Sequence, residues 1–150
     1  QVIILGKGDS AYENYFTDLS RRYVGKLITV IAFNPDLSRK IYSGADLFLM
    51  PSKSEPCGLS QMIASRYGTV PIVRETGGLF DSIKPVGNGG NGFTFANYNA
   101  YDMLYVIREA INCYYNKEFW PELVKRVMSV DFSWQRSAKE YEKIYGEMLK

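Results

Sequence analysis

Short apolar runs alternate with amphipathic segments along the first half of the chain, and this alternation is the feature that most constrains its fold. Four apolar runs are predicted to be strands: residues 2–5, 27–33, 45–50 and 69–73. Continuous runs of this kind are typical of strands that are buried on both faces. Between them lie segments in which apolar residues recur at helical spacing. The alternation predicts βαβ units and therefore an α/β fold with a parallel sheet.

The remainder of the chain is predicted to be mainly helical. A brief extended piece at 93–95 precedes three helices, at about 99–117, 119–128 and 133–148. Between residues 84 and 92, four glycines, two asparagines and a proline predict a flexible surface loop. With helices between its strands, the sheet is expected to be Rossmann-like and doubly wound, with helices on both faces. Ligands of such sheets bind beyond the carboxyl ends of the strands.

Composition excludes several classes of protein. The chain has no histidine, which excludes catalytic triads and metal sites built on histidine. Its two cysteines, Cys57 and Cys113, have no metal-binding spacing and are expected to be reduced thiols in the cytoplasm. A net charge of +2 gives no general attraction to nucleic acid or to a membrane surface. Because the chain begins at Gln1 rather than Met, we expect it to be a piece of a longer protein.

The segment between the third strand and the next helix is the best candidate for a binding site. Residues 51–61 read PSKSEPCGLSQ, so a loop carries Glu55 into a helix whose first turn contains Gly58. Unpaired N–H groups at a helix start bind phosphate or sugar hydroxyls, and glycine allows a close approach. Glu55 could hold a sugar hydroxyl or balance a developing positive charge. Alternatively, Glu55 only favours the helix dipole and Gly58 only makes a turn; spacing alone does not separate these interpretations.

Four other signals are weaker. Residues 76–78, Thr-Gly-Gly, form a second glycine turn at the end of the next strand. Gly6-Lys7-Gly8 lacks the third glycine of a dinucleotide-binding fingerprint, and no P-loop lysine follows it. Phe33, at a strand end, could stack on a base, although most aromatic residues at such places belong to the core. Arg74 could meet a phosphate, although such cations are more often solvated.

Taken together, these segments resemble the C-terminal domain of bacterial glycogen synthases and plant starch synthases. The resemblance rests mainly on ADLFLMPS at 45–52 and EPCGL at 55–59. RYGTVPIVR at 66–74, TGGLFD at 76–81 and DFSW at 131–134 follow in the same order, and GKGD at 6–9 precedes them. The resemblance therefore covers nearly the whole chain.

The resemblance implies the C-terminal half of a two-domain GT-B glycosyltransferase. Residues 1–150 would be the domain that binds the nucleotide-sugar donor, and the N-terminal acceptor domain would be absent from the chain. The family transfers glucose from ADP-glucose to the 4-hydroxyl end of an α-1,4-glucan with retention, in glycogen biosynthesis in the cytoplasm. It implies no cofactor and no metal. Because part of the site would lie in the missing segment, we expect this chain alone to be inactive.

The resemblance also assigns roles to residues. Glu55 is the catalytic candidate, which would contact the donor glucose and support an oxocarbenium-like transition state. The donor-binding candidates are Gly6, Gly8, Phe33, Tyr42, Cys57, Gly58, Leu59, Ser60, Thr76, Gly77 and Gly78. Those at 57–60 would meet the glucose and phosphates and those at 76–78 the glucose end, whereas the first four would border adenine and ribose. Ile63 stands where related retaining enzymes carry a second glutamate, so this helix supports no two-carboxylate mechanism.

Two alternatives remain open. The chain could belong to another GT-B glycosyltransferase that uses a UDP- or GDP-sugar, because an aromatic at Phe33 does not identify the base. It could instead be a non-enzymatic Rossmann-like binding module, although such a module would not need Glu55 beside a glycine-bearing helix start. The expected partners are a nucleotide sugar and, through the missing domain, the glucan; nucleic acid and membrane are not expected.

Overall fold

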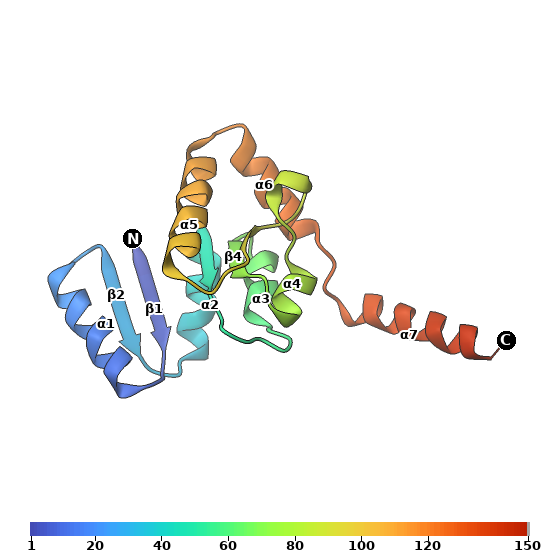
Figure 1. Cartoon of the computed structure of the whole chain (residues 1–150), viewed down its shortest axis with the longest axis horizontal. Coiled ribbons are helices and arrows are strands. Elements are labelled where there is room, and N and C mark those ends of the chain that lie inside the picture. The colour runs from blue at the N-terminus through green and yellow to red at the C-terminus, as the bar shows by residue number, and fades with distance from the viewer. Residues whose placement is uncertain (150) are drawn as a thin grey trace. The chain divides into compact units, whose positions relative to one another are not determined.

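The computed structural model describes residues 1–149 and shows an α/β protein (Figure 1). The chain divides into two compact units, Gln1–Gly44 and Ala45–Lys150. Every strand pair in either unit is parallel, and helices follow the strands, so the predicted α/β class is confirmed. Among the described residues, no helix has the length and apolar character needed to cross a membrane.

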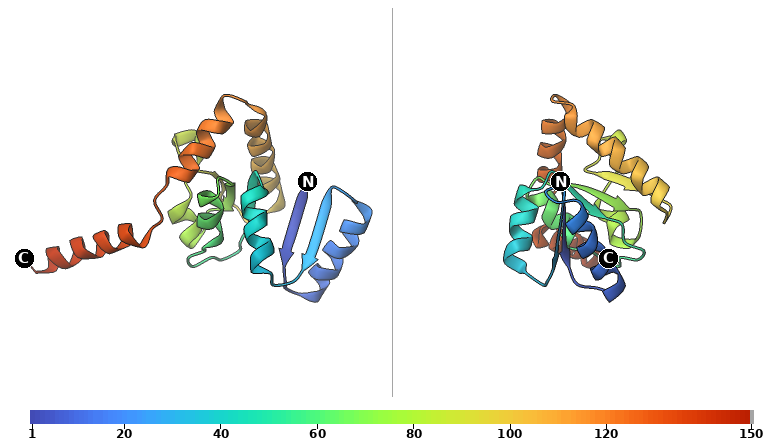
Figure 2. Two further views of the ribbon diagram at one scale, coloured as in Figure 1. Left: turned by 180° about the vertical axis from the view of Figure 1, so that it is seen from behind. Right: turned by 90° about the vertical axis from the view of Figure 1, so that its left-hand side faces the viewer.

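The first unit is a single β–α–β–α arrangement. Its elements are β1 (Val2–Gly6), α1 (Ser10–Arg22), β2 (Leu27–Ile31) and α2 (Pro35–Gly44). β1 and β2 pair in parallel with Val2 opposite Leu27, and α1 packs along this pair (Figure 2). Asp9 caps the N-terminus of α1, because its Oδ1 accepts a hydrogen bond of 2.8 Å from the amide of Ala11. β2 ends two residues earlier than predicted, which leaves Phe33 outside the strand.

The second unit contains a three-stranded parallel sheet in the order β3-β4-β5. Its strands are β3 (Leu47–Met50), β4 (Val70–Arg74) and β5 (Phe93–Phe95). Its helices are α3 (Ser60–Arg66), α4 (Gly77–Ser82), a 3-10 turn at Val86–Asn88, α5 (Ala100–Tyr115), α6 (Phe119–Ser129) and α7 (Trp134–Met148). β4 lies between the other two strands and is the most deeply buried element.

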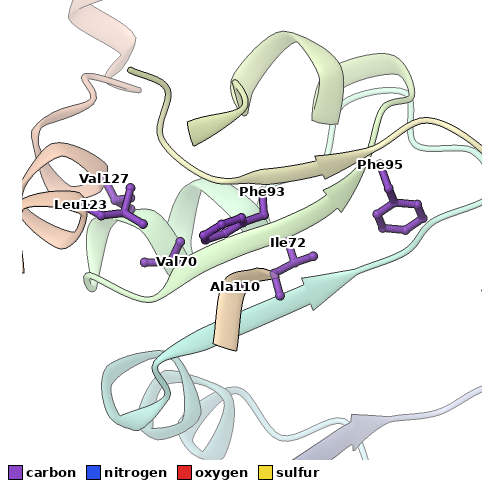
Figure 3. Packing of buried hydrophobic residues seen from close by; sticks show 7 residues of the cluster. All are labelled: Val70, Ile72, Phe93, Phe95, Ala110, Leu123 and Val127. Carbon is purple, nitrogen blue, oxygen red and sulfur yellow. The ribbon is translucent and has the colours of Figure 1, made fainter. Parts of the chain in front are cut away.

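Side chains from β4 enter both hydrophobic clusters of the second unit. Val70 and Ile72 pack with Phe93, Phe95 and residues of α5 and α6 (Figure 3). Val73, which points to the opposite side of the strand, packs with Leu79 of α4 and with Ile83. Burial of each such aliphatic side chain contributes about 1.5–3 kcal/mol. The second cluster therefore fixes α4 against the end of β4.

The segment between α4 and β5 is not the flexible loop that its glycines predicted. Asn91 is buried, and its side chain accepts a 2.8 Å hydrogen bond from the Lys84 amide and donates one of 3.0 Å to Ser82 O. At Gly90, a methyl group would lie 2.5 Å from the carbonyl carbon of Lys84 and closer still to its oxygen. The glycine content therefore reflects close backbone packing in a hydrogen-bonded turn.

Helix α7 exposes an apolar face. Trp134, Tyr141 and Tyr145 are 86%, 59% and 59% exposed, and Met148 is 77% exposed. Contiguous apolar surfaces of this kind mark places where proteins make contacts.

Candidate functional site

The loop between β3 and α3 carries most of the candidate residues. Glu55 is half-buried, whereas Cys57 and Leu59 are exposed. Gly58 has a φ of +75°, a left-handed conformation that strongly favours glycine, and it turns the chain into α3. Leu59 caps α3 without a side-chain hydrogen bond, so no side chain of the loop occupies the first amides of this helix.

The loop packs directly against the first turn of α4. The amide of Gly78 donates a 3.1 Å hydrogen bond to the carbonyl of Glu55. A methyl group at Gly77 would lie 3.1 Å from the carbonyl carbon of Glu55, and one at Gly78 would lie 2.6 Å from the Cα of Cys57. Residues 76–78 were predicted to form a turn, but Gly77 and Gly78 are the first residues of α4, with Thr76 as its cap. The structure thus brings the two glycine-bearing segments together at the carboxyl ends of β3 and β4.

Arg74 is neither a solvated cation nor a free phosphate ligand. Its Nε donates a 2.8 Å hydrogen bond to Ser52 O, and its Nη2 donates to Lys53 O. The guanidinium also lies over the ring of Tyr98, 5.5 Å from its centroid. Arg74 therefore fixes the beginning of the loop to the end of β4, a role that the sequence did not reveal.

The other candidates form a separate group within the first unit. Gly6 ends β1, and the amide of Gly8 donates a 2.8 Å hydrogen bond to the carboxylate of Glu13. Phe33 is 87% exposed, so it is not a core residue of that unit. Tyr42 lies half-buried on α2. An exposed aromatic just beyond a strand end is available for stacking on a base.

Gln61 is a polar residue of this region that the sequence analysis did not select. Its side chain is wholly buried, and its Nε2 lies 2.9 Å from Gly58 O, 3.3 Å from Cys57 O and 3.1 Å from Ser82 Oγ. A glutamine in the first turn of a helix, three residues after a left-handed glycine, was the available signal. The sequence alone does not place Ser82 beside it, because 21 residues separate the two.

The structure offers no obvious metal centre and two different thiols. Within residues 1–149, no group of three or more Cys, Asp or Glu side chains is placed to hold a metal ion. Cys57 and Cys113 are both free. Burial, together with the nearby Glu109 carboxylate, raises the pKa of the Cys113 thiol.

Comparison with known proteins agrees with the predicted resemblance. The family model of the glycosyl transferases group 1 matches residues 1–123. The chain is 50% identical over 153 residues to a glycogen synthase of Geobacillus thermodenitrificans, covering 100% of this chain and 32% of that protein. A glycogen synthase of Clostridium acetobutylicum is 51% identical over 153 residues, covering 99% of this chain and 32% of its own length. The chain thus spans about a third of the length of the curated relatives that it matches.

Solved structures show the same fold. The catalytic domain of starch synthase IV from Arabidopsis thaliana, bound to ADP and acarbose, matches with a TM-score of 0.87 and 37% identity. The match covers 97% of this chain and 31% of that one. A sucrose-phosphate synthase from Thermosynechococcus elongatus matches with a TM-score of 0.68 and 21% identity, over 99% of this chain and 38% of its own. The predicted fold, that of the C-terminal half of a GT-B enzyme, is confirmed by the first of these.

Proposed function

The chain belongs to the glycosyl transferases group 1 family, and from this premise we propose that it is the donor-binding part of a glycogen synthase that uses ADP-glucose. One observation carries the proposal: the Glu55–Gly58 loop packs on the first turn of α4, at the carboxyl ends of two neighbouring parallel strands. Ligands of parallel sheets bind at such ends. The 50% identity to glycogen synthases along the whole chain supports the reaction, and the ADP bound to the similar starch synthase IV supports the donor.

In this proposal each candidate residue has its own role in binding the donor. Cys57, Gly58, Leu59 and Ser60 bind the glucose and the diphosphate, largely through their backbone. The residues at 76–78 line the glucose end. Phe33 stacks on adenine, and Gly6, Gly8 and Tyr42 border the base and the ribose. The exposed ring of Phe33 supports its role, because a buried ring could not stack on a ligand.

The proposed reaction moves one glucosyl group. The bond between the anomeric carbon and the diphosphate oxygen breaks, and ADP leaves with the electron pair. The 4-hydroxyl oxygen of the glucan forms the new bond on the same face, and its proton passes to the departing phosphate oxygen. Glu55 stabilises the positive charge that develops on the sugar ring. Amides that face the leaving diphosphate stabilise its growing negative charge, and such contacts are stronger in the transition state than in the ground state.

The proposal extends to what lies outside the chain. In this proposal no metal or cofactor takes part, because backbone amides, with cationic side chains from outside this chain, hold the diphosphate. The glucan acceptor binds to a domain that this chain does not include, so the chain alone is inactive. Its place is the cytoplasm, where both thiols stay reduced.

Transfer of labelled glucose to glycogen by the full-length protein tests this proposal. ADP-glucose, UDP-glucose and GDP-glucose are offered separately, and transfer from ADP-glucose is expected to dominate. Glu55→Ala is expected to lower kcat by about 100-fold or more, the usual cost of removing one group that stabilises transition-state charge. Glu122→Ala is the matched control, because Glu122 is an exposed carboxylate on α6 that pairs only with Lys125.

Three outcomes would contradict the proposal. Preference for UDP- or GDP-glucose would indicate another GT-B enzyme. Nucleotide binding without any transfer would indicate a binding module. Full activity of the Glu55→Ala protein would remove Glu55 from the catalytic site.

A further inference from the structure

The environment of the Gln61 side chain is not explained by a contribution to the stability of the fold. All of its side chain is buried, yet Oε1 has no hydrogen-bond partner among the described residues. Buried polar atoms are nearly always paired, so an unpaired amide oxygen calls for a reason. An apolar side chain of the same length would fill the space without that unpaired atom. The reason must therefore lie in what the amide nitrogen holds.

The nitrogen faces three oxygen atoms from two segments. Two are the carbonyls of Cys57 and Gly58 in the candidate loop, and the third is the hydroxyl of Ser82 at the end of α4. Backbone carbonyls only accept hydrogen bonds, so the side chain must present its NH₂ group to them, and this fixes the orientation of the amide. A methyl group at Gly58 would lie 2.6 Å from Oε1, so the Gln61 amide packs closely against the backbone of Gly58.

Ser82 extends this connection to the second glycine segment. Its Oγ accepts from Gln61 and donates a 2.6 Å hydrogen bond to Gly78 O. The Gln61 bridge, defined as the Nε2 of Gln61 and the Oγ of Ser82, therefore joins the carbonyl of Gly58 to that of Gly78. On its other side the loop is held by the hydrogen bond from the Gly78 amide to the Glu55 carbonyl.

We propose that Gln61, acting through Ser82, is a positioning residue that holds the Glu55–Gly58 loop in the shape needed for glucosyl transfer. The inference rests on the proposed function and deepens it. Gln61 is too deeply buried to touch the donor, so it acts through the backbone that it fixes. A displacement of about 1 Å in a catalytic constellation costs up to roughly 100-fold in rate. Loss of the bridge should therefore lower kcat more than it weakens donor binding, since preorganised groups act mainly on transition-state charge.

Gln61→Met in the full-length protein is the direct test. Methionine keeps the length and fills the space but removes both N–H donors. With ADP-glucose and glycogen as substrates, we expect kcat to fall by about 10- to 100-fold while the KM for ADP-glucose changes by less than about threefold. Ser65→Ala is the matched control, because Ser65 is buried on the same helix but its Oγ donates a 2.8 Å hydrogen bond to Gln61 O, away from the loop. Its kcat and KM should equal those of the wild type.

Ser82 provides a second pair of variants. Ser82→Ala breaks the middle of the bridge and should lower kcat by about three- to tenfold. Ser82→Thr keeps a hydroxyl at that position and should restore most of kcat. If Ser82 had a purely structural role, both the alanine and the threonine variant would give less folded enzyme, and threonine would not restore kcat.

Hydrogen exchange without ligand separates failure of the inference from failure of the proposed function. In the Gln61→Met protein, the peptide that contains the Gly78 amide should exchange at least about tenfold faster than in the Ser65→Ala protein. Unchanged exchange together with unchanged kcat per folded molecule would overturn the positioning role. Faster exchange in a protein whose wild type transfers no sugar would support the bridge as a structural connection but overturn both its catalytic role and the proposed function.

Discussion

Gly78→Ala is the substitution whose cost follows most directly from the structure. The added methyl group would lie 2.6 Å from the Cα of Cys57, which is 0.8 Å inside the 3.4 Å where ordinary contact begins. Both partners are backbone, so no side chain can turn aside and the loop must move away from α4. Such overpacking costs about 1–3 kcal/mol. Loss of the Gly78–Glu55 hydrogen bond costs about 1 kcal/mol more, and the better helix propensity of alanine offsets about the same amount.

We therefore expect Gly78→Ala to lower the free energy of unfolding by about 2 kcal/mol. Urea unfolding followed by circular dichroism measures this value, and the thermal midpoint should fall by roughly 4–8 °C. Gly146→Ala is the control: Gly146 lies inside α7 with no atom within 4 Å of the added methyl, so alanine should be neutral or stabilising. A Gly78→Ala protein within about 0.5 kcal/mol of the wild type would refute the close approach on which the site description depends.

Three further predictions concern the rest of the second unit. Asn91→Ala should cost about 1–3 kcal/mol in urea unfolding, because two buried hydrogen bonds are lost; an unchanged midpoint would mean that the 84–92 turn is not held by this side chain. Iodoacetamide should modify the exposed Cys57 at least about tenfold faster than Cys113, whose pKa is raised by burial; equal rates by mass spectrometry would contradict this difference. Hydrogen bonds from Ser133 lower the pKa of Asp131 below 3.8, so its carboxylate stabilises the fold above that pH and this contribution disappears as the pH falls through the lowered pKa. Asp131→Asn should therefore flatten the acid-induced loss of helical circular dichroism below about pH 4, and an unaltered curve would count against it.

The sequence predicted the strands well because each is a short apolar run closed by a turn residue. Among the described residues, β2, β3 and β5 lie within the predicted runs, β1 and β4 extend one residue past theirs, and every strand pair is parallel. The ends of the strands were predicted less accurately, because hydrogen bonding rather than hydrophobicity determines where a strand stops. β2 stops at Ile31, and Phe33 lies beyond it, fully apolar but exposed.

Glycine content misled the prediction for residues 84–92. Glycine allows flexibility, but it also allows backbone segments to approach each other, and the sequence does not tell these uses apart. The buried side chain of Asn91 decides the case, because its hydrogen bonds to residues seven and nine positions earlier close the turn. The local sequence pattern does not predict these hydrogen-bond partners.

Glycine is equally ambiguous at the candidate site, and the structure changes the interpretation of Gly77 and Gly78. Gly77 and Gly78 were predicted to line the donor glucose, yet the structure gives each a sufficient structural reason, namely contact with the backbone of Glu55 and Cys57. These glycines are therefore not by themselves evidence of a ligand. They are instead evidence that the shape of the 55–58 loop depends on α4, since a larger residue at either position would displace it. If the loop binds the donor, then its precision comes from contacts that no donor atom touches, and substitutions in α4 should alter catalysis as well as substitutions in the loop.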